Sequence, residues 1–518
     1  MDELRPAPPE TEETALHKGR LGTFGIVFFV VAAAAPLVGM TGAVPVAIVA
    51  GNGAAVPGAY VAVGITLLLF SVGYATMSHH VTNTGAFFAY VGRGLGIGPG
   101  VGSAFVSLVA YLAVQLAIYG FFGAVASGEI NDKFGLSWPW YVWSLIAWAL
   151  VTALSLASVD VGAKVLGVFM TIEVLSLLVM SLAVIFTGGG PDGFDLAASF
   201  APSNILVGGL TGTAGIALAF AFASYIGFEA TAIYGEESKE PKKTVPRATY
   251  IAVVLITVLF GLSTLAIVTF LGSSQVVDQV LKLSTVDGTP LADPASVVFT
   301  VAQQSVGDWI GDWAGTLVSN TMQWLVLSSL FAGLLAFQNS AARYFFSLGR
   351  AGVFPNALDR VNKLGSPYIA TLTTSVVGFV VIVLFWAFKK DPVLNLFYWF
   401  SGLAVLAIVL VEILVSLAVI VYFRRSRADT RIWHTVIAPV IAALGLALGM
   451  YLLMSRFNLL AGTQADGVDP SLPGSSWKMN TLGWGLVILP FLMFVIGWIV
   501  GLLRRSDENE DAVKDLVT

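Results

Sequence analysis

The feature that most constrains this chain is a series of apolar segments, each of about 20 residues or more. A helix of about 20 apolar residues is long enough to cross the roughly 30 Å hydrocarbon core of a lipid bilayer. The 518 residues are 57% apolar and only 11% charged, whereas soluble domains carry about a quarter charged residues. We therefore expect an integral membrane protein rather than a soluble domain.

Hydropathy along the chain predicts twelve membrane-spanning helices. Stretches such as GNGAAVPG, GGGPDG and EESKEPKKTVPR separate them. The longer segment between the seventh and eighth spans is expected to form an extracellular loop with a short surface helix. The predicted spans are residues 22–50, 55–77, 98–126, 138–157, 163–187, 205–234, 247–271, 314–347, 368–388, 393–423, 434–456 and 481–503.

The distribution of cations predicts the orientation of these spans. With the N-terminus in the cytoplasm, twenty of the 26 lysines and arginines fall in the inner loops and tails, as the positive-inside rule requires. This places both termini in the cytoplasm and the chain in the plasma (inner) membrane. Residues 1–20, which are acidic and rich in proline, are expected to form a disordered tail. Residues 506–518 are expected to form a second cytoplasmic tail.

Two predicted spans carry residues that favour a break near their centres. The first contains AAPLVGMTGAVP, with Pro36, Gly39 and Gly42, and the sixth contains AFASYIGFEATAIYGEE, with Gly227 and Glu229. The two segments are five spans apart, so they would face in opposite senses, as an inverted repeat of five plus five spans requires. The alternative is that these glycines and prolines serve helix packing alone, since both are common in membrane helices.

Broken helices in mid-membrane predict a binding site for a small polar solute. Their free backbone N–H and C=O groups cannot be satisfied by hydrocarbon. The N-terminus of a half-helix suits a carboxylate, and the carbonyl end of another suits an ammonium group. Thr41 would add a hydroxyl group, and Phe222, Tyr225 and Phe228 would wall or gate the pocket.

Three longer stretches carry a resemblance to a known family. They are HVTNTGAFFAYVGRGLGIGPGVG, AFASYIGFEATAIYGEES followed by KEPKKTVPRA, and AFQNSAARYFFSLGRAGVFPNALDRVNKLGSPY. Together they resemble the amino acid–polyamine–organocation superfamily of permeases, of the amino acid permease type, from about Leu21 to Arg425. The motif after the second span is not a phosphate loop, because it follows no strand and lacks GK[ST].

The resemblance implies an all-α membrane protein of twelve transmembrane helices. Its LeuT-like core would contain one inverted repeat at residues 21–190 and another at 204–424, followed by two C-terminal helices at 432–505. It also implies secondary transport by alternating access, with an amino acid or related amine as the substrate. The substrate carboxylate would bind the first break and its amine the sixth. The substrate-binding residues expected on this basis are Gly39, Met40, Thr41, Gly42, Phe222, Ala223, Tyr225, Ile226 and Gly227.

Glu173 and Glu229 are the two carboxylates that the span map places deep in the membrane. In several proton-coupled members of the family, the position of Glu173 is a buried lysine, so the lysine mechanism cannot be transferred. A buried carboxylate must be neutral, hydrogen-bonded or paired with a cation. We expect proton coupling. Sodium coupling is the alternative, with Ser328 and Ser329 as candidate ligands, although serines in membrane helices often bond to their own backbone.

Other functions stay open at this stage. A polyamine or inorganic-cation transporter of the same fold would also suit two membrane carboxylates. A membrane sensor of amino acids would normally add a signalling domain to the short tails. An enzyme is not expected, because the chain has no cysteine and only four histidines, all predicted near the cytoplasmic surface. No cofactor, bound metal or nucleic acid is expected, only a coupling proton or sodium ion, and the sequence does not determine the oligomeric state.

Overall fold

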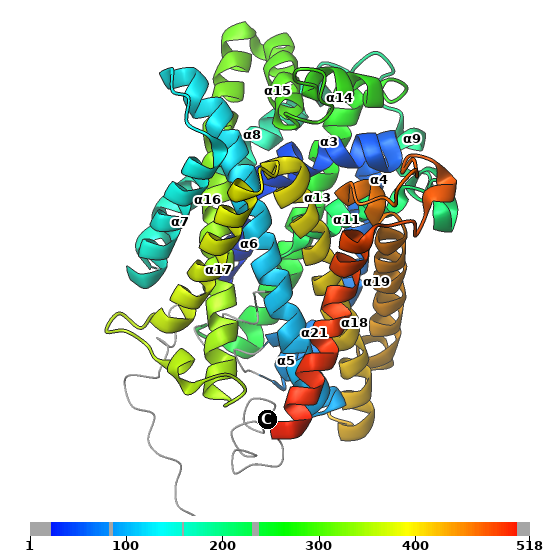
Figure 1. Ribbon diagram of the computed structural model, residues 1–518. Coiled ribbons are helices and arrows are strands. Elements are labelled where there is room, and N and C mark those ends of the chain that lie inside the picture. The colour runs from blue at the N-terminus through cyan, green and yellow to red at the C-terminus, as the bar shows by residue number, and fades with distance from the viewer. Residues whose placement is uncertain (1–21, 82–85, 158–159, 230, 232–237, 505–518) are drawn as a thin grey trace, which may run out of the picture.

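The computed structural model describes residues 22–81, 86–157, 160–229, 231 and 238–504. The two predicted tails, residues 1–20 and 506–518, lie outside these residues. Helices running side by side make up most of the described chain (Figure 1). Two isolated β-bridges join described residues, Val286 with Thr289 and Gln464 with Met479.

The first part of the chain forms α-helices, with π-helical and 3-10-helical segments between some of them. Their bounds are α1 (Thr23–Ala34), α2 (Pro36–Val38), η1 (Gly39–Ala43), α3 (Val44–Val46), η2 (Ala47–Asn52), η3 (Gly53–Ala55), α4 (Val56–Ser78), α5 (Ala86–Leu95), α6 (Ile97–Phe134), α7 (Trp140–Ala157) and α8 (Asp160–Phe186).

The remainder begins with short helices and continues into long ones. Their bounds are α9 (Leu196–Phe200), α10 (Pro202–Ile205), η4 (Gly209–Thr211), α11 (Ala214–Tyr225), α13 (Pro241–Leu271), α14 (Val276–Ser284), α15 (Ala295–Ile310), α16 (Asp312–Arg350), η5 (Asn356–Asp359), α17 (Tyr368–Ala387), η6 (Pro392–Phe397), α18 (Tyr398–Ser426), η7 (Trp433–Ile437), α19 (Ala438–Ser455), α20 (Phe457–Ala461), η8 (Pro473–Ser475) and α21 (Thr481–Arg504). The loop before α16 thus contains two helices, α14 and α15, where the sequence predicted one.

By length and composition, ten described helices can cross a membrane. The number is eleven if Pro202–Thr211 and Ala214–Tyr225, which meet at 115°, form one span. Pro36–Ser78 counts once in this total, although it contains parts of two predicted spans and has a non-helical residue, Gly51, at φ −104° and ψ −111°. The protein is therefore an all-helical, multi-pass membrane protein, and the twelve-span topology stays a prediction.

The helices differ in how far they are enclosed by the rest of the protein. In α6 and α16 about four fifths of the apolar window is buried, against 22% in α7 and α21. Exposed apolar side chains such as Leu150 on α7 and Ile499 on α21 suit contact with lipid. The long helices α6, α16 and α18 therefore form the centre of the bundle, where a transport site would be shielded from lipid.

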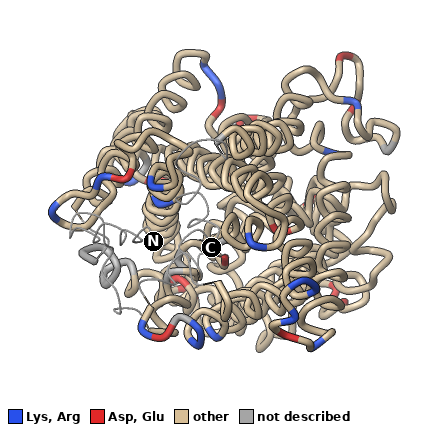
Figure 2. The backbone as a smooth tube through the Cα atoms, turned by 90° about the horizontal axis from the view of Figure 1, so that it is seen from below, with Lys and Arg blue, Asp and Glu red and all other residues tan. Residues whose placement is uncertain are grey.

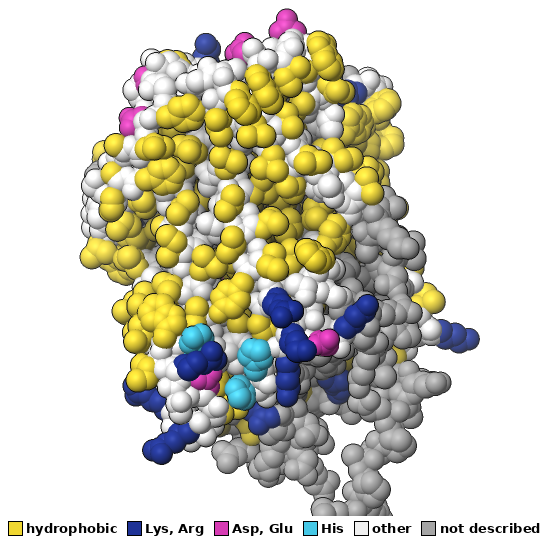
Figure 3. Space-filling view, turned by 180° about the vertical axis from the view of Figure 1, so that it is seen from behind, with side chains coloured by type: hydrophobic (Ala, Val, Ile, Leu, Met, Phe, Trp, Pro, Cys, Tyr) yellow, Lys and Arg dark blue, Asp and Glu magenta, His cyan; other side chains and the backbone are white. Residues whose placement is uncertain are grey.

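The charged side chains are distributed unevenly along the molecule. A belt of apolar side chains covers the middle of the face in Figure 3, with Lys, Arg and His below it and Asp and Glu concentrated at the opposite end. Seen from below, the charged residues lie mainly in the connecting segments (Figure 2). The lower end carries α5 and the end of α21 (Figure 1). An uncharged belt between two charged ends is the surface expected of a protein in a bilayer.

Candidate functional site

The first predicted span is interrupted at Ala35. Its backbone lies in the left-handed region, at φ 44° and ψ 67°, between α1 and α2. The cause is Pro36, because proline disfavours the helical conformation of the residue before it but is tolerated at the start of a helix. Of the residues predicted to favour this break, Pro36 lies directly after it, whereas Gly39 and Gly42 are wound into the π-helix η1.

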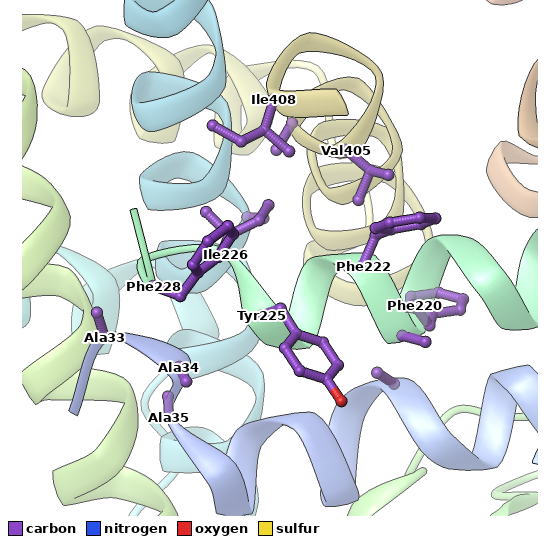
Figure 4. Packing of buried hydrophobic residues seen from close by; sticks show 14 of the residues in the cluster. Ala33, Ala34, Ala35, Phe220, Phe222, Tyr225, Ile226, Phe228, Val405 and Ile408 are labelled. Carbon is purple, nitrogen blue, oxygen red and sulfur yellow. The ribbon is translucent and has the colours of Figure 1, made fainter. Parts of the chain in front are cut away.

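The sixth predicted span is interrupted at the predicted glycine. Helix α11 ends at Tyr225, Ile226 is extended at φ −56° and ψ 127°, and Gly227 has φ 113°. A Cβ atom added at Gly227 would lie 2.6 Å from the Cβ of Ala33. The two interruptions are therefore in direct contact, as the neighbouring positions of Ala33–Ala35 and Tyr225–Phe228 illustrate (Figure 4).

Glu229 binds the backbone of the second interruption. Its Oε2 accepts a hydrogen bond of 2.8 Å from the Gly227 N–H, and its Oε1 accepts one of 2.9 Å from the Tyr111 hydroxyl of α6. The Tyr74 hydroxyl of α4 donates to the Glu229 carbonyl oxygen at 2.7 Å. The carboxylate thus satisfies an N–H that the broken helix leaves without a partner and joins the break to α6, whereas the backbone carbonyl of Glu229 joins it to α4.

Glu173 has a corresponding position at the first interruption. It is fully enclosed on α8, and its Oε1 accepts hydrogen bonds from the Leu37 N–H at 2.6 Å and from the Ser329 hydroxyl of α16 at 2.9 Å. Leu37 is the second residue of the half-helix that starts at Pro36, so its N–H belongs to a positive helix end. Ser328 instead donates to the carbonyl of Leu325 in its own helix.

A small cavity of about 60 Å³ lies beside the two interruptions. Helices α1, α6, α11, α16 and α18 and the segment after Ala35 contribute its walls. Two of the nine predicted substrate-binding residues, Gly39 and Ala223, line it. The full lining is Ala33, Ala34, Ala35, Val38, Gly39, Ala43, Val114, Ala117, Ile118, Phe220, Ala223, Ser224, Phe337, Phe397 and Ser401.

The other predicted residues of the first span lie next to the cavity but are engaged elsewhere. Met40, Thr41 and Gly42 are buried in η1. The Thr41 hydroxyl donates to the Leu37 carbonyl at 2.7 Å, so it is bonded to its own helix. A Cβ atom at Gly42 would lie 2.9 Å from the ring of Phe121, which gives this glycine a packing role.

The predicted residues of the sixth span point to different surroundings. Phe222 lines a separate apolar cavity of about 250 Å³ between α4, α11 and α19. The Tyr225 hydroxyl bonds to Thr257 at 3.0 Å, and the ring of Phe228 packs edge-on against Phe70 at 5.9 Å. Ile226 is buried in the apolar core. Phe222, Tyr225 and Phe228 therefore contact other parts of the protein and do not line the small cavity.

Sequence reasoning missed several lining residues that a helical pattern could have indicated. Phe220 and Ser224 were missed although they share one face of α11 with the predicted Ala223, because residues three and four apart, or adjacent on one side, are neighbours on a helix. The aromatic residues at positions 222 and 225 attracted attention but lie on other faces. Contributions from α6, α16 and α18 had no local signal, since they depend on how distant helices pack.

The expectation of two deep carboxylates is also wrong, because Glu412 is a third. It lies on α18 within the apolar helix Pro392–Ser426 and is 2% exposed. A long apolar run conceals a single glutamate when hydropathy is averaged over a window, which is why the span map did not single it out. Among the described residues, no group of three or more His, Asp or Glu side chains could hold a metal ion.

Comparison with known proteins gives one family. A model of the family described as amino acid permease matches residues 25–509. The chain is 24% identical over 331 residues to the histidine permease HisP of Lactococcus lactis, covering 62% of this chain and 64% of that protein. It is 24% identical over 370 residues to the histidine permease of Saccharomyces cerevisiae, covering 70% and 57%. The matches thus span less than two thirds of either histidine permease.

A further similarity extends over more of the related protein. The chain is 21% identical over 366 residues to the aromatic amino acid transport protein AroP of Escherichia coli, covering 70% of this chain and 72% of AroP. Two of these names refer to histidine and the third to aromatic amino acids, so the named substrates differ among the proteins that this chain resembles.

Proposed function

The chain belongs to the amino acid permease family, whose members are membrane transporters rather than enzymes, and from that premise we propose that it carries an amino acid across the plasma membrane. The mechanism proposed is secondary active transport by alternating access. The observation that carries this proposal is the contact of two interrupted helices at Ala33 and Gly227, with a cavity beside them. Interrupted helices near the bilayer midplane are where such transporters bind their substrates.

The free backbone groups at the two interruptions suit an α-amino acid. The half-helix that begins at Pro36 presents its N-terminus, which attracts a carboxylate. Helices α1 and α11 both end at the interruptions, and their last carbonyl groups suit an ammonium group. The cavity of about 60 Å³ is much smaller than ligand pockets of about 300 Å³ or more. In our proposal the described conformation is closed, and the helices move apart to admit substrate.

We propose proton coupling through Glu173. Its carboxylate accepts the Leu37 N–H at the half-helix N-terminus, close to where the substrate carboxylate would bind. Two anions compete for one positive helix end. A proton bound to Glu173 removes this competition, so proton and substrate would bind together, as symport requires. Sodium coupling is the alternative, because Ser329 also contacts Glu173, whereas the hydroxyl of Ser328 is occupied within its own helix.

The proposed topology has twelve spans, with repeats at residues 21–190 and 204–424 and a C-terminal pair at 432–505. Both termini would lie in the cytoplasm. The gathering of Lys, Arg and His at one end of the molecule supports this orientation (Figure 3). The positions of the two interruptions, one in each proposed repeat, support the inverted arrangement.

Uptake by purified protein in proteoliposomes tests the proposed function. Radiolabelled histidine, proline, branched-chain, basic and aromatic amino acids are offered under an imposed proton gradient, a sodium gradient or neither. We expect accumulation of at least one amino acid under the proton gradient alone. A strict requirement for sodium would contradict the coupling through Glu173. Uptake of polyamines or inorganic cations, with no amino acid as substrate or competitor, would contradict the proposed function itself.

A further inference from the structure

The small cavity beside the two interruptions has almost wholly apolar walls. Among the described residues that line it, Ser224 and Ser401 are the polar side chains, and no charged side chain takes part. The Ser224 hydroxyl is already engaged, because it donates to the Phe220 carbonyl at 2.9 Å and lies 3.1 Å from the Tyr60 hydroxyl. Apart from the backbone of the interruptions, the cavity therefore offers a bound solute few polar partners.

The buried carboxylates near the interruptions do not compensate for this lack of charge. Glu173 and Glu229 do not line the cavity, and both accept hydrogen bonds from donors of the protein itself. A charged substrate side chain would give up its hydration here without gaining a counter-ion, and burial of an unpaired charge is strongly unfavourable. The cavity therefore selects against basic and acidic side chains.

The walls of the cavity come from two sources. One source is the interruptions themselves, with Ala33–Ala35 and the end of α11 close together (Figure 4). In the proposed function these walls bind the α-carboxylate and the ammonium group, so a substrate held there directs its side chain to the remaining walls. The remaining walls are formed by α6, α16, η6 and α18, through Val114, Ala117, Ile118, Phe337, Phe397 and Ser401.

The part of these walls that α6 contributes is aliphatic. Val114 lies three and four residues before Ala117 and Ile118, so the three share one face of that helix. A Cβ atom added at Gly333 of α16 would lie 3.2 Å from the Cδ1 of Ile118 and 3.9 Å from the Cβ of Ala35. Ile118 and Gly333 therefore lie close to each other and to the first interruption, where they limit the space for a substrate side chain.

We propose that the substrate is an amino acid with an uncharged, apolar side chain, and that Ile118 and Gly333 set the size of the side chain admitted. This inference rests on the proposed function and names its substrate class. An apolar side chain gains free energy from burial between such walls. The nitrogens of an imidazole ring need hydrogen-bond partners, so histidine is disfavoured together with the basic and acidic amino acids.

Uptake into proteoliposomes tests the substrate class, with proton and sodium gradients both imposed so that the coupling ion does not affect the comparison. Labelled alanine, valine, leucine and phenylalanine are compared with labelled histidine, lysine and glutamate at equal concentration. We expect at least one apolar amino acid to be taken up about tenfold faster than histidine, lysine or glutamate, because polar groups left unpaired in a closed site are heavily penalised. Uptake of histidine, lysine or glutamate as fast as the best apolar amino acid would overturn the proposal and leave the transport of amino acids intact.

Binding is measured separately, as the thermal unfolding temperature of the purified protein with each of these amino acids. A ligand that binds only the folded state raises this temperature. We expect a rise with at least one apolar amino acid and none with histidine, lysine or glutamate at the same concentration. If no amino acid is transported but an apolar one stabilises the protein, the proposed function fails and the substrate class assigned to the site stands. Stabilisation by histidine, lysine or glutamate alone would overturn the substrate class, and neither transport nor stabilisation by any of these amino acids would overturn both.

Substitutions in the walls test the two residues assigned to side-chain size. Ile118→Ala widens the cavity and should raise the ratio of leucine uptake to alanine uptake about tenfold. Gly333→Ala narrows the cavity and should lower that ratio. Ile118→Val removes less of the side chain and should act in the same direction as Ile118→Ala, so a failure of Ile118→Ala to fold leaves the test intact.

Ile130→Ala is the matched control. Ile130 is a half-buried residue of the same helix and does not line the cavity, so the ratio should stay unchanged. An unchanged ratio in Ile118→Val and Gly333→Ala, with both variants still transporting, would refute the assignment of these residues. An equal change in Ile130→Ala would show that the ratio reports distortion of α6 and would overturn the assignment as well.

Discussion

At the scale of single residues, the two interruptions are stabilised by the same kind of hydrogen bond. At each one, a glutamate side chain accepts a hydrogen bond from a backbone N–H that the broken helix leaves free: Glu173 from Leu37 and Glu229 from Gly227. Hydrocarbon offers no alternative partner for these N–H groups. The carboxylates therefore stabilise the breaks in the absence of substrate, and a change in either is expected to alter the breaks as well as any coupled ion.

Glu173→Gln is expected to separate proton coupling from substrate movement. The amide oxygen can still accept the Leu37 N–H, so the fold should persist, but the side chain no longer takes a proton. We expect exchange of internal for external substrate to continue and accumulation driven by a pH gradient to fall at least about tenfold, which corresponds to about 1.4 kcal/mol. Accumulation equal to that of the unmodified protein would refute proton coupling through this residue.

Two controls define the source of the pH dependence. Ser328→Ala removes a hydroxyl that is bonded within its own helix and should leave accumulation unchanged. His79 lies at the end of α4, where partial burial and the neighbouring His80 lower its pKa, so it is neutral at pH 7 and gains a proton only in more acidic solution. If His79→Asn alone flattened the pH profile, the dependence would arise at the surface rather than at Glu173.

Gly227→Ala is expected to disrupt the contact between the two breaks. A residue with a side chain is strained at φ 113° by about 1–3 kcal/mol, and its Cβ would overlap that of Ala33. Transport should be lost, and the thermal unfolding temperature of the purified protein should fall. Gly128→Ala, at an open position in α6, is the matched control. Normal uptake by Gly227→Ala would show that the close contact is not needed.

At the scale of elements, proline decides where the first span unwinds. Pro36 forces Ala35 out of the helical conformation, and the chain then winds again as α2 and η1. The second proline of this span, Pro45, lies just after the π-helix η1. Proline clashes with the carbonyl four residues earlier, and π-helical winding is one way in which a helix absorbs such a clash.

Pro36→Ala is expected to let α1 continue into α2. Alanine supplies the missing N–H and no longer restricts the backbone of Ala35, so the helix can continue through Ala35 without interruption. The protein should unfold at an equal or higher temperature while its transport falls at least about tenfold, or about 1.4 kcal/mol. Pro57→Ala, which changes a proline at the start of the unbroken helix α4, should retain transport. Full activity of Pro36→Ala would argue against a functional break at Ala35.

At the scale of the whole molecule, the sidedness of the bundle can be measured directly because the chain has no cysteine. Thr285→Cys places a thiol in the loop after α14, and Ser426→Cys places one at the end of α18. Both positions are exposed. A membrane-impermeant maleimide added to intact cells should label Thr285→Cys only, and inside-out vesicles should give the opposite result. Labelling of Ser426→Cys in intact cells would reverse the proposed topology.

The positions of the long helices could be predicted in outline from the sequence. Apolar runs gave the position of nearly every long helix, because the cost of leaving a backbone unpaired in lipid dictates helices there. The sixth span is the main exception. Its predicted start at residue 205 is replaced by a bent pair, with α11 beginning at Ala214. Short helices such as α10 and η4 form where the chain leaves the apolar region, and hydropathy does not resolve such turns.

The sequence by itself determined that the chain is helical, crosses the membrane many times and has helices that are prone to interruption at Pro36 and Gly227. These properties depend on local composition and backbone sterics. Only the tertiary structure decided which residues meet at the two interruptions. Glu173 and Leu37 are 136 positions apart in the chain, and no local pattern records that contact. The cavity faces of α6 and α11 and the contact of Ala33 with Gly227 were likewise decided by how distant helices pack, since each of these helices is apolar on several faces.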